Sequence, residues 1–287
     1  MNETISITPQ AEDFAARVEG VDLAAPLDAP AVAGIQAAFA RYPVLVFPHQ
    51  GLDAAALERC AAALGRFGHD PYVEPLEDHP HVIEVRREAG ETAPIFGSLW
   101  HSDWSFQATP PSATLLYGAE VPPVGGDTLF ADGCRAYEAL SPVMQKVLAG
   151  LSGVHSAAPS YGPQGLFARD DATRSMRIIV SADATDTRSH PVVRRHPASG
   201  RVSLFVNHVY TVGIVGMRGA ESRALLEFLF KHMTQRDFVH RHRWQPRTLV
   251  MWDNRRVVHY AEGGYEGHRR VMYRATLAGE APLAVRL

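Results

Sequence analysis

The arrangement of short apolar segments restricts the fold of this chain more than any other feature of its sequence. Segments rich in β-branched and aromatic residues, closed by Gly, Pro, Asn or Asp, have the composition of strands. They do not alternate regularly with helical segments, so a parallel doubly wound sheet is disfavoured. We expect a mainly β fold with flanking helices, built as a double-stranded β-helix, the jelly roll of cupin-like proteins. The predicted strands are residues 44–47, 82–85, 113–117, 192–193, 202–206, 248–252 and 271–276.

Capping residues predict where the helices begin. Asp28 precedes a proline in the first turn of one helix, and Asp53 precedes an apolar face that stops near Gly65. Further helices are expected near Asp132, after Ser141 and over about 220–233. These helices should attach to the outside of the two packed sheets.

Composition indicates an ordinary globular chain. Of its 287 residues, 46% are apolar and 21% are charged. The sequence contains no internal repeat and no low-complexity linker, so we expect a single domain over residues 1–287. The two cysteines cannot form a disulfide framework, and Cys60 falls on the apolar side of a predicted helix, which favours a reduced, cytoplasmic setting.

Charge and hydropathy limit the partners of the chain. The net charge of −3 gives no support for generic binding to nucleic acid or to an anionic membrane, and no apolar run is long enough to cross a bilayer. The basic cluster at 236–243 is interpreted as a solvated face or a subunit contact, with a local nucleic-acid patch as the open alternative. We expect a homo-oligomer with no nucleic-acid and no membrane partner.

Histidine is unusually frequent, with 14 residues, and a neutral imidazole is a common metal ligand. His101 and Asp103 are two residues apart, a spacing that on a strand directs both side chains to one face. This pair alone is a weak signal, but His259 follows an apolar segment at the edge of the predicted sheet. Two histidines and one carboxylate form the facial triad of non-haem Fe(II) oxygenases, which leaves positions open for a cosubstrate and O2.

Two arginines interrupt the last predicted strand. An arginine inside a strand is costly unless it pairs with a carboxylate or a phosphate, and the even spacing of Arg270 and Arg274 places both on one side. The pair therefore suggests an anionic ligand beside the metal. The alternative is a surface position paired with Glu262 or Glu266.

Several blocks of this sequence together resemble the taurine dioxygenase/2,4-D dioxygenase family of Fe(II)- and 2-oxoglutarate-dependent dioxygenases. The resemblance covers most of the chain, and the blocks occur at the spacing of the family. They are residues 19–23, 44–48, 100–103, 122–128, 137–141, 190–193, 204–207, 252–254 and 270–276.

The resemblance implies a role for each matched residue. His101, Asp103 and His259 match the iron ligands, and Thr128 and Arg270 match the pair that holds the distal carboxylate of 2-oxoglutarate. Arg274 matches an arginine that binds the substrate anion in sulfonate-oxidising members, and bracing the C1 carboxylate of 2-oxoglutarate is its alternative role.

The same resemblance implies the reaction. Fe(II) would be the cofactor, 2-oxoglutarate and O2 the cosubstrates, and succinate and CO2 the coproducts. The substrate would be a small organic anion, namely an alkyl sulfonate, a sulfate ester or an aryloxy or alkyl carboxylate. Hydroxylation would cleave a C–S or C–O bond where the attacked carbon bears sulfur or oxygen.

The sequence departs from the taurine-specific pattern, so taurine is expected to be a poor substrate. Gly97 lies where that pattern has a side-chain amide, and Trp104 replaces a smaller residue beside Asp103. The predicted substrate-binding residues, each with a core or loop position as its alternative, are Arg274, Trp104, Tyr161, His69 and Phe205.

Two other functional classes use the same residues. A hydrolase could hold Zn(II) with the same three ligands, although Thr128 and Arg270 would then lack a role. A catalytically inactive binding module is disfavoured by the intact triad, and a halogenase by the presence of Asp103. The stretch 156–190, rich in Ser, Ala, Asp, Arg and Pro, is the candidate active-site lid.

Overall fold

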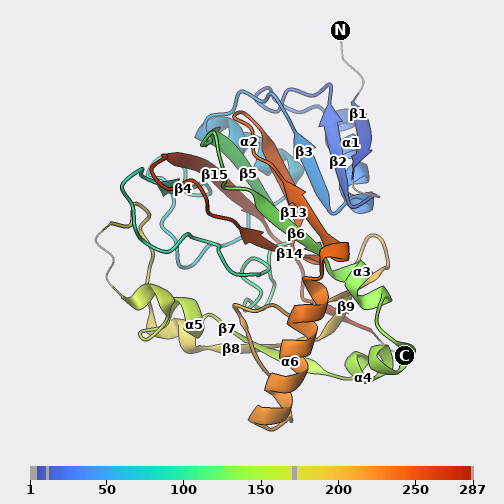
Figure 1. Cartoon of the computed structure of the whole chain (residues 1–287). Coiled ribbons are helices and arrows are strands. Elements are labelled where there is room, and N and C mark those ends of the chain that lie inside the picture. The colour runs from blue at the N-terminus through green and yellow to red at the C-terminus, as the bar shows by residue number, and fades with distance from the viewer. Residues whose placement is uncertain (1–4, 11–12, 170–172, 286–287) are drawn as a thin grey trace.

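A seven-stranded sheet forms the largest layer of the computed structural model, which describes residues 5–10, 13–169 and 173–285 (Figure 1). Its strand order is β1-β2-β3-β13-β5-β15-β4, and all neighbours are antiparallel except β2 and β3. The strands are β1 (Ser6–Gln10), β2 (Ala15–Glu19), β3 (Val44–Phe47), β4 (Ile83–Arg87), β5 (Ala113–Glu120), β13 (Leu249–Asp253) and β15 (Arg270–Leu277).

A smaller sheet packs on one face of this layer. Phe130 and Val257, from two of its strands, share an apolar core with Val250 and Met272 of the large sheet. The sandwich of two β layers confirms the expected jelly roll. The smaller sheet has the order β12-β6-β14, from β6 (Thr128–Asp132), β12 (Val239–His242) and β14 (Val257–Ala261).

Two further three-stranded sheets lie in the half of the molecule that carries α4 to α6 in Figure 1. One has the order β11-β7-β8 and the other β10-β9-β16. Their strands are β7 (Ser152–Ser156), β8 (Thr187–Pro191), β9 (Val193–Arg195), β10 (Val202–Leu204), β11 (Thr211–Ile214) and β16 (Leu283–Ala284).

Helices cover the opposite face of the large sheet. Ile35 of α1 (Ala29–Arg41) and Leu57 of α2 (Ala54–Leu64) pack against Leu115 and Met251, whose side chains point away from the sandwich interior. The remaining helices are α3 (Gly133–Glu138), α4 (Pro142–Ala149), α5 (Ala158–Tyr161) and α6 (Gly219–Met233).

The structure confirms the helix starts that the capping residues predict. The side chains of Asp28, Asp53, Asp132 and Ser141 each accept a hydrogen bond from a backbone N–H in the first turn. The predicted strands are present, although Val192 lies in a bend between β8 and β9. Several strands were not predicted because they are short and carry polar residues; β12, for example, contains two histidines and an arginine.

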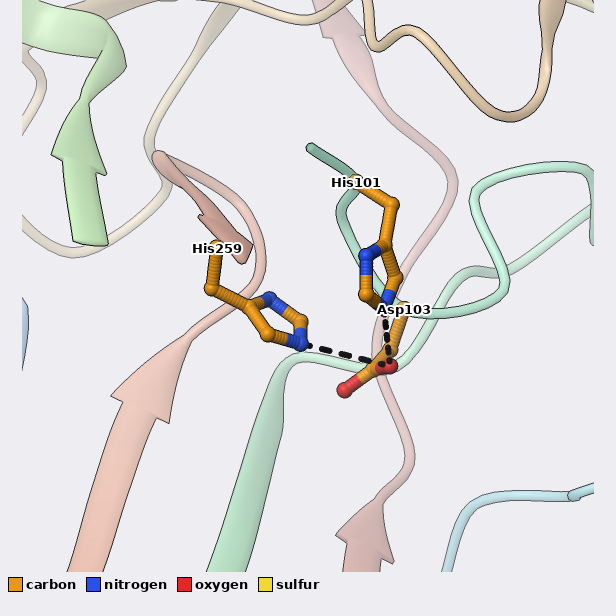
Figure 2. A group of neighbouring side chains, drawn as sticks. All are labelled: His101, Asp103 and His259. Atoms are coloured by element: carbon orange, nitrogen blue, oxygen red, sulfur yellow. Dashed lines mark ion pairs between the residues drawn. The ribbon is translucent and has the colours of Figure 1, made fainter. Parts of the chain in front are cut away.

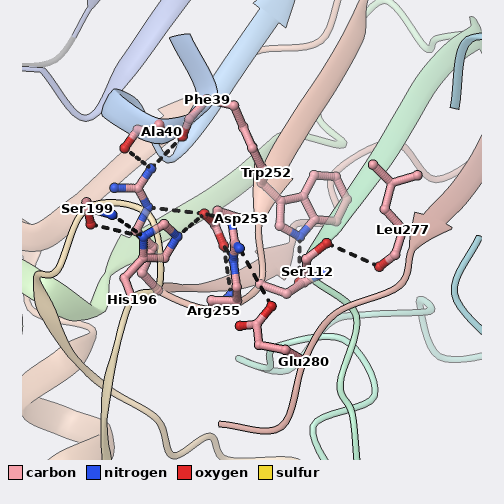
Figure 3. Close-up of polar contacts among 12 residues, drawn as sticks. Phe39, Ala40, Ser112, His196, Ser199, Trp252, Asp253, Arg255, Leu277 and Glu280 are labelled. Carbon is pink, nitrogen blue, oxygen red and sulfur yellow. Dashed lines mark hydrogen bonds and ion pairs between the residues drawn. The ribbon is translucent and has the colours of Figure 1, made fainter. Parts of the chain in front are cut away.

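A buried charge network fastens the end of β13 to the rest of the fold (Figure 3). Asp253 is fully buried and accepts hydrogen bonds from His196 Nε2 at 2.8 Å and from two nitrogens of Arg255 at 2.8 Å each. Arg256 Nε lies 3.4 Å from the same carboxylate, and its Nη2 donates to the carbonyl of Phe39 near the end of α1. One carboxylate thus neutralises cationic groups that link the large sheet to α1.

Within the basic cluster at 236–243, residues 239–242 form strand β12 of the small sheet. Arg241 lies on β12 and pairs with Asp127 and with Glu262, so part of its charge is compensated locally. Among the described residues, no helix has both the length and the apolar character needed to cross a membrane.

Candidate active site

Two histidines and one carboxylate converge between the two sheets (Figure 2). His101 and His259 form a β-bridge in which each backbone N–H donates to the carbonyl of the other, at 3.0 and 2.7 Å. Asp103 Oδ1 lies 3.6 Å from His101 Nε2 and 3.9 Å from His259 Nε2. All three side chains are buried, and their candidate ligand atoms lie within 4.8 Å of one another, which is close enough for one metal ion.

The local backbone differs from the expected strand. Of His101 and Asp103, only His101 takes part in a β-bridge; Asp103 begins a turn, and Trp104 after it has a φ of 46°. The prediction that His101 and Asp103 share one face of a strand is therefore wrong. The turn achieves the same convergence by bending the chain back toward β14.

A hydrogen-bonded cluster behind the triad fixes the carboxylate. Thr114 Oγ1 donates to Asp103 Oδ2 at 2.6 Å, and Asn254 Nδ2 donates to the same threonine at 2.8 Å. Asn254 Oδ1 in turn accepts from Trp252 Nε1 at 3.0 Å and from the backbone N–H of Asp103 at 3.3 Å. The sequence block 252–254 points to this position, but Thr114, a polar residue within an apolar strand, gives no signal of its own.

The protonation states suit a divalent cation. Burial by itself raises the pKa of Asp103, but His259, His101 and Arg274 together hold that pKa well below its usual range. Burial, together with the neighbouring His101, lowers the pKa of His259 to about 3. His101 Nδ1 lies 2.7 Å from the carbonyl of Leu99, a contact that assigns its hydrogen to Nδ1 and leaves Nε2 as the free ligand atom. A carboxylate and two neutral imidazoles are the forms that bind metal.

Arg270 lies at the start of β15, and its side chain is buried. Its Nη2 makes one long hydrogen bond of 3.4 Å to the carbonyl of Gly126, and its buried Nε has no partner. Among the described residues no ion pair involves Arg270, and burial lowers its pKa. A buried guanidinium of this kind fits a carboxylate that arrives with a ligand.

Two neighbours shape the surroundings of Arg270. Trp244 Nε1 donates to Thr128 Oγ1 at 2.9 Å, and the Trp244 ring centroid lies 5.9 Å from the guanidinium carbon of Arg270. Gly126 has a φ of 71°, and a Cβ there would lie 3.4 Å from Arg270 Nε. The structure therefore places Thr128 and Arg270 around one tryptophan, a residue that the sequence did not single out.

Arg274 has an internal partner that the sequence did not reveal. Its Nη2 donates to Asp70 Oδ1 at 2.6 Å, and its Nη1 lies 3.7 Å from Asp103 Oδ1. The alternative pairing with Glu262 or Glu266 is wrong, because Glu262 pairs with Arg241 and Arg274 is buried.

A pocket opens from the triad, and its wall is largely aromatic and aliphatic. Trp104 and Tyr161, both predicted substrate contacts, line it, with ring centroids 5.6 Å apart. Its polar groups include Arg274 and the buried hydroxyl of Tyr210. The other lining residues are Ile95, Phe96, Gly97, Ser98, Leu99, His101, Asp103, Ser160, Leu166, Phe167 and Val209.

Two predicted substrate contacts lie outside this pocket. His69 borders a separate depression, and its backbone carbonyl accepts a hydrogen bond from Gln107 Nε2. In this loop it is the next residue, Asp70, whose side chain points toward the site. Phe205 stacks on His155 with the Arg194 guanidinium 4.9 Å above its ring, so its side chain belongs to the core.

The candidate lid is not one continuous loop. Tyr161, Leu166 and Phe167 from its first part line the pocket, whereas residues 187–191 form β8, which pairs with β7. Residues 170–172 lie outside the described part of the chain. Closure of the first part over the pocket stays a prediction.

Comparison with known proteins agrees with this geometry. The model of the taurine catabolism dioxygenase TauD, TfdA family matches residues 6–276. The alpha-ketoglutarate-dependent sulfate ester dioxygenase of Pseudomonas putida is 32% identical over 98% of this chain and 92% of its own length. The alpha-ketoglutarate-dependent 2,4-dichlorophenoxyacetate dioxygenase of Cupriavidus pinatubonensis is 36% identical over 93% of this chain and 96% of its own.

The solved structures extend the match to three dimensions. The crystal structure of AAD-2 in complex with Mn(II) and N-oxalylglycine superimposes with a TM-score of 0.80 at 31% identity. The alignment covers 98% of this chain and all of that one. The chain therefore belongs to the TauD/TfdA family of alpha-ketoglutarate-dependent dioxygenases.

Proposed function

We propose that His101, Asp103 and His259 hold the Fe(II) of this dioxygenase and that Arg270 and Thr128 hold the distal carboxylate of its 2-oxoglutarate. The observation that carries this proposal is the convergence of the triad, together with a buried arginine, Arg270, that has no ion-pair partner among the described residues. A zinc hydrolase is not favoured, because it has no use for that buried cation.

The cofactor and cosubstrates supply the oxidising chemistry. With Fe(II), one O2 and one 2-oxoglutarate convert a substrate C–H into C–OH and release succinate and CO2. The protein holds the ligands in place through Thr114 and Asn254, and its aromatic wall excludes water from the reacting carbon.

The proposed substrate is a small organic anion with an apolar or aromatic body. Trp104, Tyr161 and Phe167 offer ring surfaces to such a body, and Arg274 offers its unpartnered Nε to the anionic group. Aryloxy carboxylates and alkyl sulfate esters or sulfonates have this character, and hydroxylation beside their ether or ester oxygen or their sulfur leads to bond cleavage. Taurine lacks an apolar body and should be a poor substrate.

The variant Asp103→Ala tests the iron site. It removes one of three protein ligands, so iron affinity should fall sharply and coupled succinate formation should cease. Glu227→Ala, which removes an exposed carboxylate on α6, is the matched control and should behave as wild type. Normal iron binding and succinate release in Asp103→Ala would refute the assignment.

The single domain, the cytoplasmic setting and the homo-oligomer that the sequence indicates stay predictions. Size measurement in solution tests the last of these directly.

A further inference from the structure

Asp70 is held on both oxygens by three groups at the edge of the pocket. Its Oδ1 accepts from Arg274 Nη2 at 2.6 Å and from Trp104 Nε1 at 2.5 Å, and its Oδ2 accepts from Thr276 Oγ1 at 2.8 Å. The side chain is 13% exposed. These partners come from the turn after Asp103 and from β15, so one carboxylate connects the metal loop, the last strand of the site and its own loop.

Arg274 is the only arginine or lysine among the described residues that line the pocket. Asp70 forms a close ion pair with one edge of its guanidinium, while Nε stays without a partner and the guanidinium carbon lies 5.2 Å from the Trp104 ring centroid. Once a divalent metal compensates Asp103, Asp70 remains as the anion that balances Arg274. A substrate anion therefore meets an arginine that is already neutralised.

We propose that Asp70 is a specificity-determining residue, which orients Arg274 and Trp104 and weakens the attraction of the pocket for anions. The inference rests on the proposed function. The wild-type enzyme then selects substrates mainly by the apolar body that fits the aromatic wall, and the negative charge of the substrate adds only a small preference. An unpaired arginine would instead favour an anion over its neutral isostere by roughly ten- to a hundred-fold.

The competing explanation is purely structural, in which Asp70 only fastens its loop. The variant Asp70→Asn separates the two, because an amide of nearly the same shape can still accept from Trp104 and Arg274 and can donate to Thr276. It removes the negative charge and keeps the geometry. Thr276→Val is the matched control, since it removes a hydrogen bond of Asp70 and keeps the charge.

Binding of a matched pair of probes measures the effect without turnover. Phenoxyacetate and phenoxyacetamide are titrated calorimetrically into protein loaded with Mn(II) and N-oxalylglycine, an inert analogue of 2-oxoglutarate. The ratio of their dissociation constants reports the preference for charge. We expect a preference for the acid below about tenfold in wild type and in Thr276→Val, and a further increase of about tenfold or more in Asp70→Asn.

The double variant Asp70→Asn, Arg274→Gln completes a double-mutant cycle. Its preference for the acid over the amide should not increase, because the increase in Asp70→Asn depends on the charge of Arg274. A wild-type preference of a hundred-fold or more overturns the inference even if Asp70→Asn fails to fold. An unchanged or lower ratio in a folded Asp70→Asn protein overturns it as well. Failure of the proposed function is seen separately, as absence of succinate formation by the wild-type enzyme with Fe(II) and 2-oxoglutarate in the presence of the phenoxy probes, of alkyl sulfate esters and of alkyl sulfonates.

Discussion

Arg270 and Arg274 lie four residues apart on the same strand, and both are buried, but their surroundings differ in charge. Arg270 has aromatic neighbours and no ion-pair partner among the described residues, whereas Arg274 is paired with Asp70 and lies near Asp103. A buried cation without an anion is a place for a ligand that brings its own negative charge, and a buried cation with an internal anion is already balanced. The sequence shows two equivalent arginines, and the difference between them comes from a loop some two hundred residues earlier in the chain.

A third buried arginine, Arg256, tests the premise that a buried guanidinium needs a nearby carboxylate to balance its charge. Arg256 has Asp253 beside it, in the network of Figure 3. Asp253→Ala leaves Arg255 and Arg256 without that carboxylate, so we expect a loss of ~3–5 kcal/mol in the free energy of unfolding. Chemical denaturation measures it. A loss below 1 kcal/mol would show that this fold tolerates unpaired buried cations, and it would weaken the interpretation of Arg270.

Arg270→Ala tests the uncompensated member of the pair. Truncating one partner of a buried charged contact costs ~2–5 kcal/mol, so 2-oxoglutarate affinity should fall by roughly 30-fold to several thousand-fold. Iron affinity should not change. Titration of the iron-loaded protein without oxygen gives both values, and Arg269→Ala, on an exposed arginine paired with Glu88 and Glu120, is the control that should bind normally. Unchanged 2-oxoglutarate affinity in Arg270→Ala contradicts the assignment.

His155 represents another way of burying a titratable group, which is to keep it neutral. It is buried, stacks on Phe205 and lies 3.0 Å from Ser105 Oγ, and burial lowers its pKa from 6.5 to about 3. Because the unfolded state takes up a proton below pH 6.5 and the folded state does not until about pH 3, this group makes the protein less stable as pH falls through that window.

Between pH 6.5 and 5 the expected loss from His155 is ~2 kcal/mol. His155→Gln cannot be protonated, so its free energy of unfolding should fall less than that of wild type over the same interval. Denaturant midpoints at the two pH values give the comparison. Equal pH sensitivity in the two proteins would mean that other groups account for the acid effect.

Of the variants that test the difference between Arg270 and Arg274, Gly126→Ala is expected to have the smallest effect. Its φ of 71° disfavours any side chain by ~1–2 kcal/mol, and the added Cβ would lie 3.4 Å from Arg270 Nε. Gly200→Ala is the matched control, because Gly200 has the same φ with open space around it. Both variants should lose stability, but only Gly126→Ala should also bind 2-oxoglutarate several-fold more weakly. Equal affinity in the two would exclude a role for Gly126 in shaping the Arg270 site.

The sequence predicts those features whose signal is local, such as helix caps, and those that several matched blocks indicate together. The caps of α1, α2 and α4 follow from single side chains. The matched blocks point to two histidines and one carboxylate, which the structure brings together, and their role as iron ligands stays a prediction. The turn at Asp103 does not follow from the spacing of two, because that is also the spacing of a strand and it does not reveal the left-handed conformation of Trp104.

Contacts between distant loops could not be predicted. The pairing of Arg274 with Asp70 depends on how the loop before Tyr72 folds over β15. The conformation of that loop cannot be predicted from hydrophobic periodicity, because the loop has none. For the same reason, the sequence indicates His69 as the substrate contact, whereas in the structure Asp70 is the residue that contacts Arg274. The core position of Phe205 differs from the expected substrate contact, because an aromatic residue in a matched block has the same sequence signal whether it faces a ligand or the core.

The β-bridge between His101 and His259 has a consequence for biosynthesis. One histidine lies before the midpoint of the chain and the other close to its end, and β13 and β15, which flank β5 in the large sheet, are also late in the sequence. A polypeptide still emerging from the ribosome therefore lacks His259, one of the proposed iron ligands, and both neighbours of β5 until β15 has been made. The proposed iron site can form only after this segment is synthesised, and a product truncated before His259 is left with two of its three proposed ligands.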